Sequence, residues 1–522
     1  MISDILPAFG MIFRVILIFR KMVSLHKINS SLATVEFLEN NIRMNFDSHL
    51  SLLKSLNKHR TTSAGNLLHY LALRTHDLRF LQRELSSMGI SSQSHSEGYT
   101  LNNLQKIRHL LRCLAGNDVS NDVFDQLDNE ESIKILKENA ALLLGDVSYD
   151  GQTKMMVTLP AEAALDYQLV KRLVQNGMHI ARINTAHDDE GVWKKMIANC
   201  QRASDATNHS VKIYMDLIGP RLRIASIMST SLAFTKKTGQ PVILIHKGDK
   251  LKILPAGIEG YNEDLPAISI SLPELLNEIR ISEKIWFDEG KLGGVVRSVS
   301  ENLIIIEITT CPKKGFKLKA GKGINLPESQ LSLPALTATD ADNLPFIIAN
   351  ADIVGFSFVR TTEDIDMLQR SLEMHNKTDM GIILKIETRK AFDNLPSLLF
   401  KAMEIDRVGI MIARGDLAIE LGLLRMAEVQ EEILWLAEAA HLPVVWATQI
   451  LETQVKKGRA TRAEISDVVK ATRSECIMLN KGPYIIDALK ILNDLDKRMH
   501  KHQEKEHKML RALKIAQSFI NP

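Results

Sequence analysis

Two stretches in the C-terminal half of the chain, MGIILKIE at residues 380–387 and RVGIMIARGDLAIE at residues 407–420, decide the fold. Each begins with a short, continuous apolar run and then changes to charged residues. Runs of this length and composition are typical of strands that are buried on both faces, as in a parallel sheet. Six further runs of the same kind occur in the chain, KMMVTL (154–159), HIARIN (179–184), KIYMDL (212–217), DIVGFSFV (352–359), PVVWATQ (443–449) and ECIML (475–479).

Amphipathic helical patterns separate most of these runs. Their apolar residues recur at a spacing of three and four, which places them on one face of a helix. The clearest examples are ALDYQLVKRLVQ (164–175), EDIDMLQRSLEMH (363–375), RMAEVQEEILWLAEAA (425–440) and RAEISDVVKATR (462–473). Eight strands that alternate with helices predict an α/β protein with a parallel sheet, and eight is the number that closes a (β/α)8 TIM barrel.

The alternation is interrupted between the third and fourth predicted strands. Over residues 224–325 the chain carries short β-branched runs separated by glycine or polar turns, such as NLIIIEITT (302–310). This pattern predicts an all-β domain inserted in a barrel loop. The barrel is then expected in two parts, residues 151–223 and 326–495. An insertion belongs on the face formed by the carboxyl ends of the strands, where the active sites of such barrels lie.

The residues before the barrel have a different pattern. VEFLENNI (35–42), HLSLLKSL (49–56) and NLLHYLALRTHDLRFLQREL (66–85) repeat apolar residues with helical spacing, and two more such segments follow. This spacing indicates amphipathic helices. We therefore expect an α-helical N-terminal domain over residues 1–150, and a charged C-terminal helix over residues 496–522.

The composition is that of a soluble globular protein. Of the 522 residues 45% are apolar and 24% are charged, and a formal net charge of +3 gives no electrostatic reason to expect a nucleic-acid or membrane partner. The four cysteines form no CxxC pair, which fits a reducing cytoplasm. Residues 2–19 are strongly apolar, but Arg14 lies among them and no cleavage site follows. We expect an amphipathic or disordered leader and a cytoplasmic protein.

Polar residues stand where several of the predicted strands end. In a barrel these ends meet at one mouth, so the side chains are candidates for catalysis. Lys385 and Glu387 lie two apart on one strand and therefore point to the same side. Glu387 and Asp416 are two carboxylates of the kind that hold Mg²⁺. The candidates at the strand ends are Arg182, Asn184, Asp216, Ser357, Lys385, Glu387, Asp416 and Thr448.

From Thr153 to about Leu492 the chain resembles pyruvate kinase. The individual strings are short, but their order and spacing together are specific. They are ARIN followed by TAH (181–187), MDLIGPRLRI (215–224), KGINLP (322–327), LPALT (333–337), FSFVR (356–360), LKIE (384–387), GIMIARGDLAIE (409–420), WATQILET (446–453), TRAEISDV (461–468) and CIML (476–479).

The resemblance implies transfer of a phosphoryl group from phosphoenolpyruvate to ADP, giving pyruvate and ATP, with Mg²⁺ as cofactor. Arg182 is implied to contact the transferring group, Lys385 to stabilise its charge and that of the pyruvate enolate, and Thr448 to lie near the carbon that is protonated. Glu387 and Asp416 are implied as the Mg²⁺ ligands. Further contacts are implied to the substrate from the backbone of Gly415 and Asp416, and to the nucleotide from Asn184, His187 and Arg223.

The sequence departs from the family at the site of the K⁺ ion that many pyruvate kinases use. Asn184 and Asp216 are retained, but Ala186 and Leu217 stand at the other two positions. Arg221 follows the Gly-Pro pair at a position where K⁺-using members have an acidic residue. Because arginine is always charged, we expect its guanidinium, near Asn184 and Asp216, to replace the ion, so that K⁺ is not required.

A second departure follows the eighth predicted strand. CIMLNKGPYI (476–485) stands where the family has a Ser-Gly-Glu-Thr-Ala run that supports the mouth and the subunit contacts. We expect a homo-oligomer that differs from the usual tetramer, without the effector control that a separate C-terminal domain exerts in many relatives. The N-terminal helical domain has no counterpart in ordinary pyruvate kinases, and it is either a dimerisation or regulatory module or a stabilising cap.

Two other functions stay open. The altered run after the eighth strand and the added helical domain are consistent with a catalytically degenerate relative, retained as a binding or regulatory protein. A Mg²⁺-dependent barrel lyase that acts on pyruvate-type substrates could use similar Glu and Asp ligands. The phosphoryl-handling set of Arg182, Lys385 and Thr448 and the inserted β domain disfavour the lyase.

Overall fold

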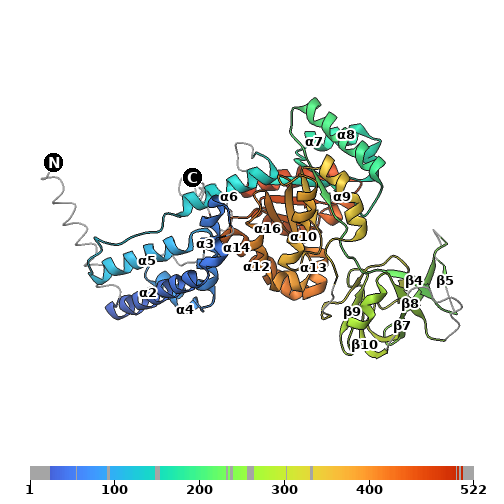
Figure 1. The fold of residues 1–522 in the computed structure, drawn as a ribbon, viewed down its shortest axis with the longest axis horizontal. Helices are drawn as coiled ribbons and strands as arrows, with labels where there is room; N and C mark the ends of the chain where they lie inside the picture. The colour runs from blue at the N-terminus through green and yellow to red at the C-terminus, as the bar shows by residue number, and fades with distance from the viewer. Residues whose placement is uncertain are drawn as a thin grey trace, which may run out of the picture.

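The computed structural model of the chain has three parts, which Figure 1 places in a row. A helical N-terminal domain lies at one end, a barrel lies in the centre, and a β domain lies at the other end. The residues that the structure describes are 24–54, 56–90, 95–146, 153–230, 233–234, 239–255, 264–300, 303–329, 333–500, 503–504 and 507–508.

The barrel is closed and has eight parallel strands, as the sequence predicts. The strands follow chain order around the barrel, and the last strand pairs with the first. All eight predicted runs are strands, and most of their residues are buried, as expected for strands covered on both faces. The barrel strands are β1 (Lys154–Thr158), β2 (Ile180–Asn184), β3 (Lys212–Asp216), β14 (Ile353–Phe356), β15 (Gly381–Ile386), β16 (Val408–Ala413), β17 (Val444–Ala447) and β18 (Cys476–Leu479).

Helices follow the strands and cover the outside of the barrel (Figure 1). Their apolar faces pack on the outward side chains of the strands, such as the fully buried Trp446, and form the largest core of the molecule. Three of them begin with a capping box, in which Thr337 pairs with Asp340, Thr361 pairs with Asp364 and Thr461 pairs with Glu464. The helices are α7 (Tyr167–Gln175), α8 (Glu190–Thr207), α9 (Ala338–Asn350), α10 (Thr362–Met374), α11 (Arg389–Asp393), α12 (Leu395–Ala402), α13 (Arg414–Leu421), α14 (Leu423–Ala439), α15 (Glu452–Lys457), α16 (Arg462–Ala471) and α17 (Ile485–Met499).

Between β3 and β14 the chain leaves the barrel and forms the predicted all-β domain. One sheet has the strand order β13-β9-β10-β11-β7-β8-β4 and a smaller one has the order β12-β6-β5. The domain has its own core, and a β-bridge between Arg223 and Gly323 joins the two segments of its neck. Its strands are β4 (Ile224–Met228), β5 (Ala233–Phe234), β6 (Pro241–Ile245), β7 (Lys250–Leu254), β8 (Ala267–Ile270), β9 (Lys284–Phe287), β10 (Leu292–Ser300), β11 (Leu303–Thr310), β12 (Phe316–Leu318) and β13 (Ile324–Asn325).

The N-terminal domain is helical, as predicted, and has an apolar core of its own. The amphipathic segment at residues 66–85 forms two helices, because Asp77 accepts a hydrogen bond from the backbone N–H of Arg79 and this local turn competes with the helix. The helices are α2 (Leu25–Ser48), η1 (Leu50–Leu53), α3 (Lys58–Arg74), α4 (Arg79–Ser87), η2 (Glu97–Tyr99), α5 (Thr100–Ala115) and α6 (Asn129–Leu144).

The helical domain and the barrel share buried contacts. Leu143 and Leu144 at the end of α6 lie in the apolar cluster inside the barrel, where Leu143 approaches the first residues of β15 and β16. The Asn66 side chain in α3 donates hydrogen bonds to the carbonyl oxygens of Glu97, at 2.7 Å, and of Ala439 in α14, at 2.9 Å. The added domain is therefore anchored at the face of the barrel opposite the mouth.

Two predicted segments lie at the ends of the chain. The apolar segment at residues 2–19 lies outside the described residues, and no helix within the described part is long and apolar enough to cross a membrane. Most of the helix predicted over residues 496–522 also lies outside the described residues; within them α17 ends at Met499, and the short strands β19 (Gln503–Glu504) and β20 (His507–Lys508) follow.

Candidate active site

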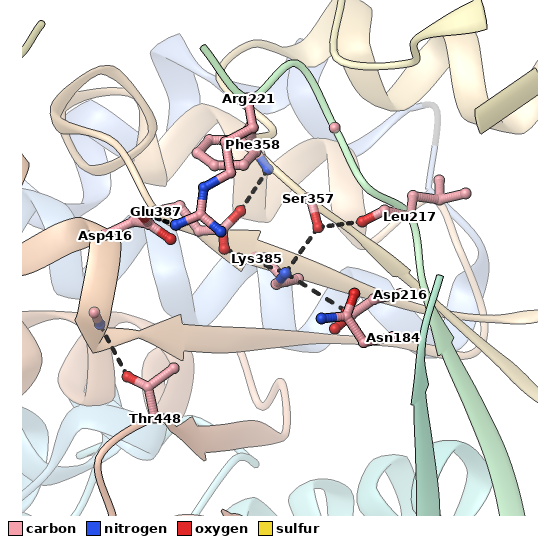
Figure 2. A network of polar contacts seen from close by, with 12 residues as sticks. Asn184, Asp216, Leu217, Arg221, Ser357, Phe358, Lys385, Glu387, Asp416 and Thr448 are labelled. Carbon is pink, nitrogen blue, oxygen red and sulfur yellow. Dashed lines mark hydrogen bonds and ion pairs between the residues drawn. The ribbon is translucent and has the colours of Figure 1, made fainter. Parts of the chain in front are cut away.

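Polar side chains from neighbouring strands meet at the mouth of the barrel (Figure 2). The Lys385 ammonium lies 3.6 Å from Asp216 Oδ1 and 3.2 Å from Glu387 Oε1, and donates a hydrogen bond of 2.7 Å to Ser357 Oγ. Arg182 Nε donates to the other oxygen of Asp216, at 2.7 Å. Five of the eight strand-end residues that the sequence singled out therefore form a single buried network.

The pleat of the strands directs these side chains to one place. Tyr214 and Asp216 lie two apart on β3 and point the same way, and the Tyr214 hydroxyl donates to the Asp216 carboxylate. Gly355 on β14 lies directly against this pair. A Cβ atom at Gly355 would lie 1.9 Å from Tyr214 Oη and 2.3 Å from Asp216 Oδ1, so any larger residue would displace them.

The buried charges of the network balance one another. Burial disfavours the Lys385 ammonium, but the charges of Asp216 and Glu387 outweigh this effect and raise the pKa of Lys385. Burial also disfavours the Asp216 carboxylate, yet Arg182 and Lys385 hold its pKa below the ordinary value. Arg182 is fixed by a further hydrogen bond, from Nη1 to Thr158 Oγ1 at 2.8 Å. Two oriented cations and one ionised carboxylate therefore occupy the mouth at neutral pH.

Glu387 and Asp416 form a pair of carboxylates beside this network. Glu387 accepts a hydrogen bond of 2.7 Å from the backbone N–H of Phe358. Burial raises the pKa of Glu387, the Lys385 ammonium opposes this, and the charge of Asp416 raises the pKa further. A divalent cation would relieve this repulsion, and Mg²⁺ is commonly held by one or two carboxylates with substrate oxygens completing its shell. Glu387 and Asp416 therefore fit a Mg²⁺ site.

The described residues contain no metal site made by protein side chains alone. No group of three or more His, Cys, Asp or Glu side chains among them is placed to hold an ion. A site of two carboxylates leaves positions in the shell of Mg²⁺ for water and for oxygens of a ligand, as in many enzymes that handle phosphates.

Arg221 lies beside the carboxylate pair. Its Nη2 is 3.1 Å from Asp416 Oδ1, and Figure 2 shows the guanidinium on the side of Asp416 and Glu387. Asn184 and Asp216, near which the sequence places this side chain, lie apart from it in the same view. The structure thus pairs Arg221 with a different carboxylate from the predicted one.

Thr448, which follows β17, has an uncommon backbone conformation. Its φ of +67° is rare for a β-branched residue, and such conformations cluster at functional sites. Thr448 Oγ1 accepts a hydrogen bond of 2.9 Å from Gly415 N, and its carbonyl accepts one of 2.6 Å from Arg414 Nη2. Arg414 is also paired with both oxygens of Asp467. Thr448 and Gly415, two predicted substrate contacts, therefore lie side by side at the start of α13.

The predicted nucleotide contacts lie at the edge of the mouth. Burial lowers the pKa of His187. The positive charges of Lys481, Arg223 and Arg182 lower it further, and the negative charge of Asp188 opposes them. Asn184 closes a local turn, since its Oδ1 accepts a hydrogen bond of 3.2 Å from a backbone N–H two residues on. A neutral imidazole among several cations suits an anionic ligand.

A cavity of about 620 Å³ opens between the barrel and the neck of the β domain, and Arg221 and Asp416 line it. Glu420 of α13 also lines it, and its side chain hydrogen-bonds with Asn325 of β13. Burial raises the pKa of Glu420 to about 7, although this hydrogen bond opposes the shift. A volume of this size is typical of small-molecule sites.

Comparison with known proteins connects this geometry with one family. Residues 151–485 match the family model described as pyruvate kinase, barrel domain, which is well over half of the chain. The chain belongs to the pyruvate kinase family. The match covers the barrel and the inserted β domain, and the N-terminal helical domain lies outside it.

Individual pyruvate kinases are similar over the same part. The pyruvate kinase of Geobacillus stearothermophilus is 30% identical over 377 residues, which are 71% of this chain and 60% of that protein. The pyruvate kinase of Corynebacterium efficiens is 31% identical over 333 residues, which are 63% of this chain and 65% of that protein. The chain thus spans less than two thirds of the length of these two relatives.

Three residues around this pyruvate kinase barrel mouth were not predicted from the sequence. Tyr214 could have been found, because it lies two residues before Asp216 on the same strand. Lys481 and Arg414 could have been found from their places just after β18 and β16, where barrel sites gather their side chains. The pairing of Arg414 with Asp467 was not predictable, because it depends on how α13 and α16 pack.

Proposed function

We propose that the chain catalyses Mg²⁺-dependent transfer of a phosphoryl group from phosphoenolpyruvate to ADP, giving pyruvate and ATP. The observation that carries this proposal is the Lys385 ammonium, buried between Asp216 and Glu387 with the carboxylate of Asp416 next to Glu387. Phosphoryl transfer depends on positioning and charge neutralisation more than on covalent chemistry by the protein. A fixed cation beside a carboxylate pair at a barrel mouth suits both needs.

Arg182 and Lys385 have the role of neutralising the transferring group. Both are held by the same carboxylate, Asp216, so that the two positive charges are oriented before the substrate arrives. Such preorganised charge is the largest single source of rate enhancement in many enzymes. When bound at Glu387 and Asp416, Mg²⁺ supplies further charge neutralisation to the substrate oxygens.

Gly415 and Thr448 have the role of positioning the other end of the substrate. The N–H of Gly415 lies in the first turn of α13, where backbone donors and the helix dipole favour an anion such as a carboxylate. In the ligand-free arrangement its acceptor is Thr448 Oγ1. A substrate carboxylate that takes over this N–H would release the Thr448 hydroxyl toward the carbon that is protonated.

The proposed enzyme does not require K⁺. Arg221 supports this part of the proposal because it brings a permanent positive charge into the mouth, next to Asp416. Ala186 and Leu217, which stand at two positions of the family's K⁺ site, bring no side-chain oxygen. Activity should therefore require Mg²⁺ but not K⁺.

The test is pyruvate formation from phosphoenolpyruvate and ADP with Mg²⁺, with and without K⁺ at constant ionic strength. Turnover under both conditions is the expected result. Turnover only with K⁺ would keep the kinase and refute the role of Arg221. Failure of a folded, Mg²⁺-binding protein to form any pyruvate would refute the kinase.

One observation favours a second candidate, a catalytically degenerate binding or regulatory protein. Arg221 engages Asp416, one of the two proposed Mg²⁺ ligands, in an ion pair of 3.1 Å. A permanent cation at that carboxylate opposes the metal. Calorimetry measures binding and the pyruvate assay measures conversion, and together they separate the two candidates. A degenerate relative should bind phosphoenolpyruvate in the presence of Mg²⁺ but form no pyruvate.

The remaining parts of the proposal concern the whole protein. We propose a homo-oligomer in the cytoplasm that acts on small molecules, on the strength of its family and of its nearly neutral composition. Light scattering on the purified chain tests the oligomer, and fractionation of the source cells tests the location.

A further inference from the structure

A second group of reactive side chains lies far from the barrel mouth, at the end of α5 in the helical domain (Figure 1). His109 and Cys113 stand one helical turn apart, so their side chains lie on the same face. Cys113 Sγ lies 3.8 Å from His109 Nε2, and His109 Nδ1 lies 2.8 Å from Asp122 Oδ2. A thiol, an imidazole and a carboxylate therefore stand in sequence, in the order used by enzymes that activate a nucleophile.

The carboxylate is held firmly in place. The Asp122 side chain is only 4% exposed, and Arg112 Nη1 donates to its other oxygen at 2.6 Å. The ring of Phe124 packs edge-on against the imidazole, with 5.4 Å between the ring centroids. Because an ionised carboxylate can only accept, Nδ1 of a neutral His109 carries the hydrogen and Nε2 presents its lone pair to the thiol. The base is therefore oriented by a third group.

The arrangement is unsuited to a metal ion. His109 contacts Cys113 and Asp122 through opposite nitrogens of its ring, so the three groups form a line and do not converge on a common point. Among the described residues no cluster of three or more metal-ligating side chains of these types is placed to hold an ion. General-base chemistry is the use that a linear array supports.

Cys113 is accessible enough to react. Its side chain is half-buried, whereas those of Cys200 and Cys476 are buried. Cys311 is also half-buried, but its thiol donates to the carbonyl of Ile245 at 3.3 Å, and within the described part of the chain it has no hydrogen bond to an imidazole. The chain thus provides an internal reference thiol of similar exposure.

The charges around Cys113 decide how its thiol can be activated. Burial raises its pKa, the charge of Asp122 raises it further, and Arg112 opposes these effects. The resting group is therefore a protonated thiol, not a preformed thiolate. It becomes a good nucleophile only if the proton leaves as the sulfur attacks, and His109 Nε2 is the base in contact with it.

We propose that Cys113 is a site of modification by small disulfides, with His109 as its general base and Asp122 as the residue that positions the base. The Cys113 S–H proton passes to His109 Nε2, and the sulfur attacks one sulfur of the disulfide. The new S–S bond forms as the S–S bond of the reagent breaks, and the leaving thiolate takes the proton from the imidazolium. Cys113 is oxidised to a mixed disulfide and the reagent is reduced to one thiol.

The experiment uses the full chain and dithiodipyridine, an uncharged aromatic disulfide whose release of thione is followed by absorbance. Peptide mass spectrometry assigns each rate to Cys113 or Cys311. Between about pH 7 and about pH 8 the rate at Cys311 should rise about tenfold, with its thiolate fraction. The rate at Cys113 should rise less steeply and be the larger at pH 7, because the imidazole removes the proton.

Variants of the base test the assignment. His109→Phe should lower the Cys113 rate at pH 7 by about 10²-fold, the lower end of what a general base contributes, and restore the steeper pH dependence. Asp122→Asn should lower the rate by a smaller factor. An unchanged Cys311 rate in each variant is the control for the reagent, and an unchanged far-UV circular dichroism spectrum verifies that the helical domain is intact. The proposal is overturned if Cys113 reacts no faster than Cys311 at pH 7, or if His109→Phe leaves their ratio unchanged.

Discussion

At the scale of single residues, the proposed chemistry depends on Lys385. Its ammonium is the shared partner of Asp216 and Glu387, and both of these side chains are almost fully buried. Without the ammonium Asp216 keeps only Arg182, and the buried Glu387 loses its cation, which is costly in free energy. The same residue therefore affects both activity and stability.

Replacing Lys385 by methionine keeps most of the side chain and removes the charge. We expect turnover to fall by at least about 10²–10³-fold, the loss that follows removal of one group that stabilises transition-state charge. The free energy of unfolding should fall by about 3–5 kcal/mol, because a buried ion pair loses one partner. Binding of a divalent cation at Glu387 and Asp416 should be largely intact. Steady-state kinetics, urea unfolding and Mn²⁺ titration measure the three effects.

Ser357→Ala is the matched control for this variant. It removes the hydrogen bond to the ammonium but leaves the charge in place. Its cost should be about 1 kcal/mol in stability, as for a single hydrogen bond, with most of the turnover retained. Undiminished turnover in the Lys385→Met protein would contradict the assigned role.

Arg221 provides a second prediction at this scale. Its guanidinium contacts Asp416 in a partly exposed pair, and such pairs contribute up to about 1 kcal/mol. Arg221→Ala should therefore tighten Mn²⁺ binding by up to about fivefold, since the metal no longer meets a competing cation. The comparison is Arg223→Ala, because Arg223 donates to the carbonyl of Gly321 and acts on Asp416 only through a longer-range charge interaction, so its effect should be smaller. Weaker Mn²⁺ binding in the Arg221→Ala protein would show that the pair does not oppose the metal.

At the scale of elements, α13 connects the mouth of the barrel with the neck of the β domain. It carries Asp416 in its first turn and Glu420 one turn later, where the Glu420 side chain hydrogen-bonds with Asn325 of β13. Burial raises the pKa of Glu420 from an ordinary value of 4.5 to about 7. Folding therefore favours the protonated form of the Glu420 carboxyl group.

A pH dependence of stability follows from this shift. The pKa of Glu420 is higher in the folded state than in the unfolded state. Its contribution to the free energy of unfolding is therefore fully present below about pH 4.5 and is lost as the pH rises through about 7. The change in the free energy of unfolding is about 3 kcal/mol. In Glu420→Gln this loss should be absent, so the variant should gain stability relative to the parent between pH 5 and pH 8. Urea unfolding of both proteins across this range measures the difference. Parallel curves would contradict the prediction.

Elements were predictable from the sequence where one physical signal dominates. The β15 and β16 runs are continuously apolar because both of their faces are covered, and that signal identified the barrel. The alternation of side chains placed Lys385 and Glu387 on one side of their strand. The direction of Arg221 was not predictable, because it depends on the path of the neck between two domains. The Cys113–His109 contact follows from their spacing of four residues on one helix, whereas the position of Asp122 depends on how the chain turns after α5.

At the scale of the whole molecule, the helical domain and the barrel are joined through one core. Leu143, near the end of α6, is 1% exposed and packs with residues inside the barrel, such as Ile383 and Met411. Asn66 adds a hydrogen bond across the same joint. A domain that fills part of another domain's core is expected to unfold together with it.

Leu143→Ala tests whether the two parts behave as one unit. We expect it to lower the free energy of unfolding by about 2–5 kcal/mol, because it leaves a cavity in the core of the barrel. Leu142→Ala makes the same chemical change one residue away at a side chain that is 41% exposed, so its effect should stay within about 0.5 kcal/mol. Unfolding is followed by far-UV circular dichroism and by the fluorescence of Trp446, a fully buried barrel residue, in a variant whose other three tryptophans are phenylalanine. If circular dichroism and fluorescence report one coincident transition, and it shifts only for Leu143→Ala, then α6 is part of the barrel's folding unit. If the barrel transition does not move in Leu143→Ala, the helical domain is an independent attachment.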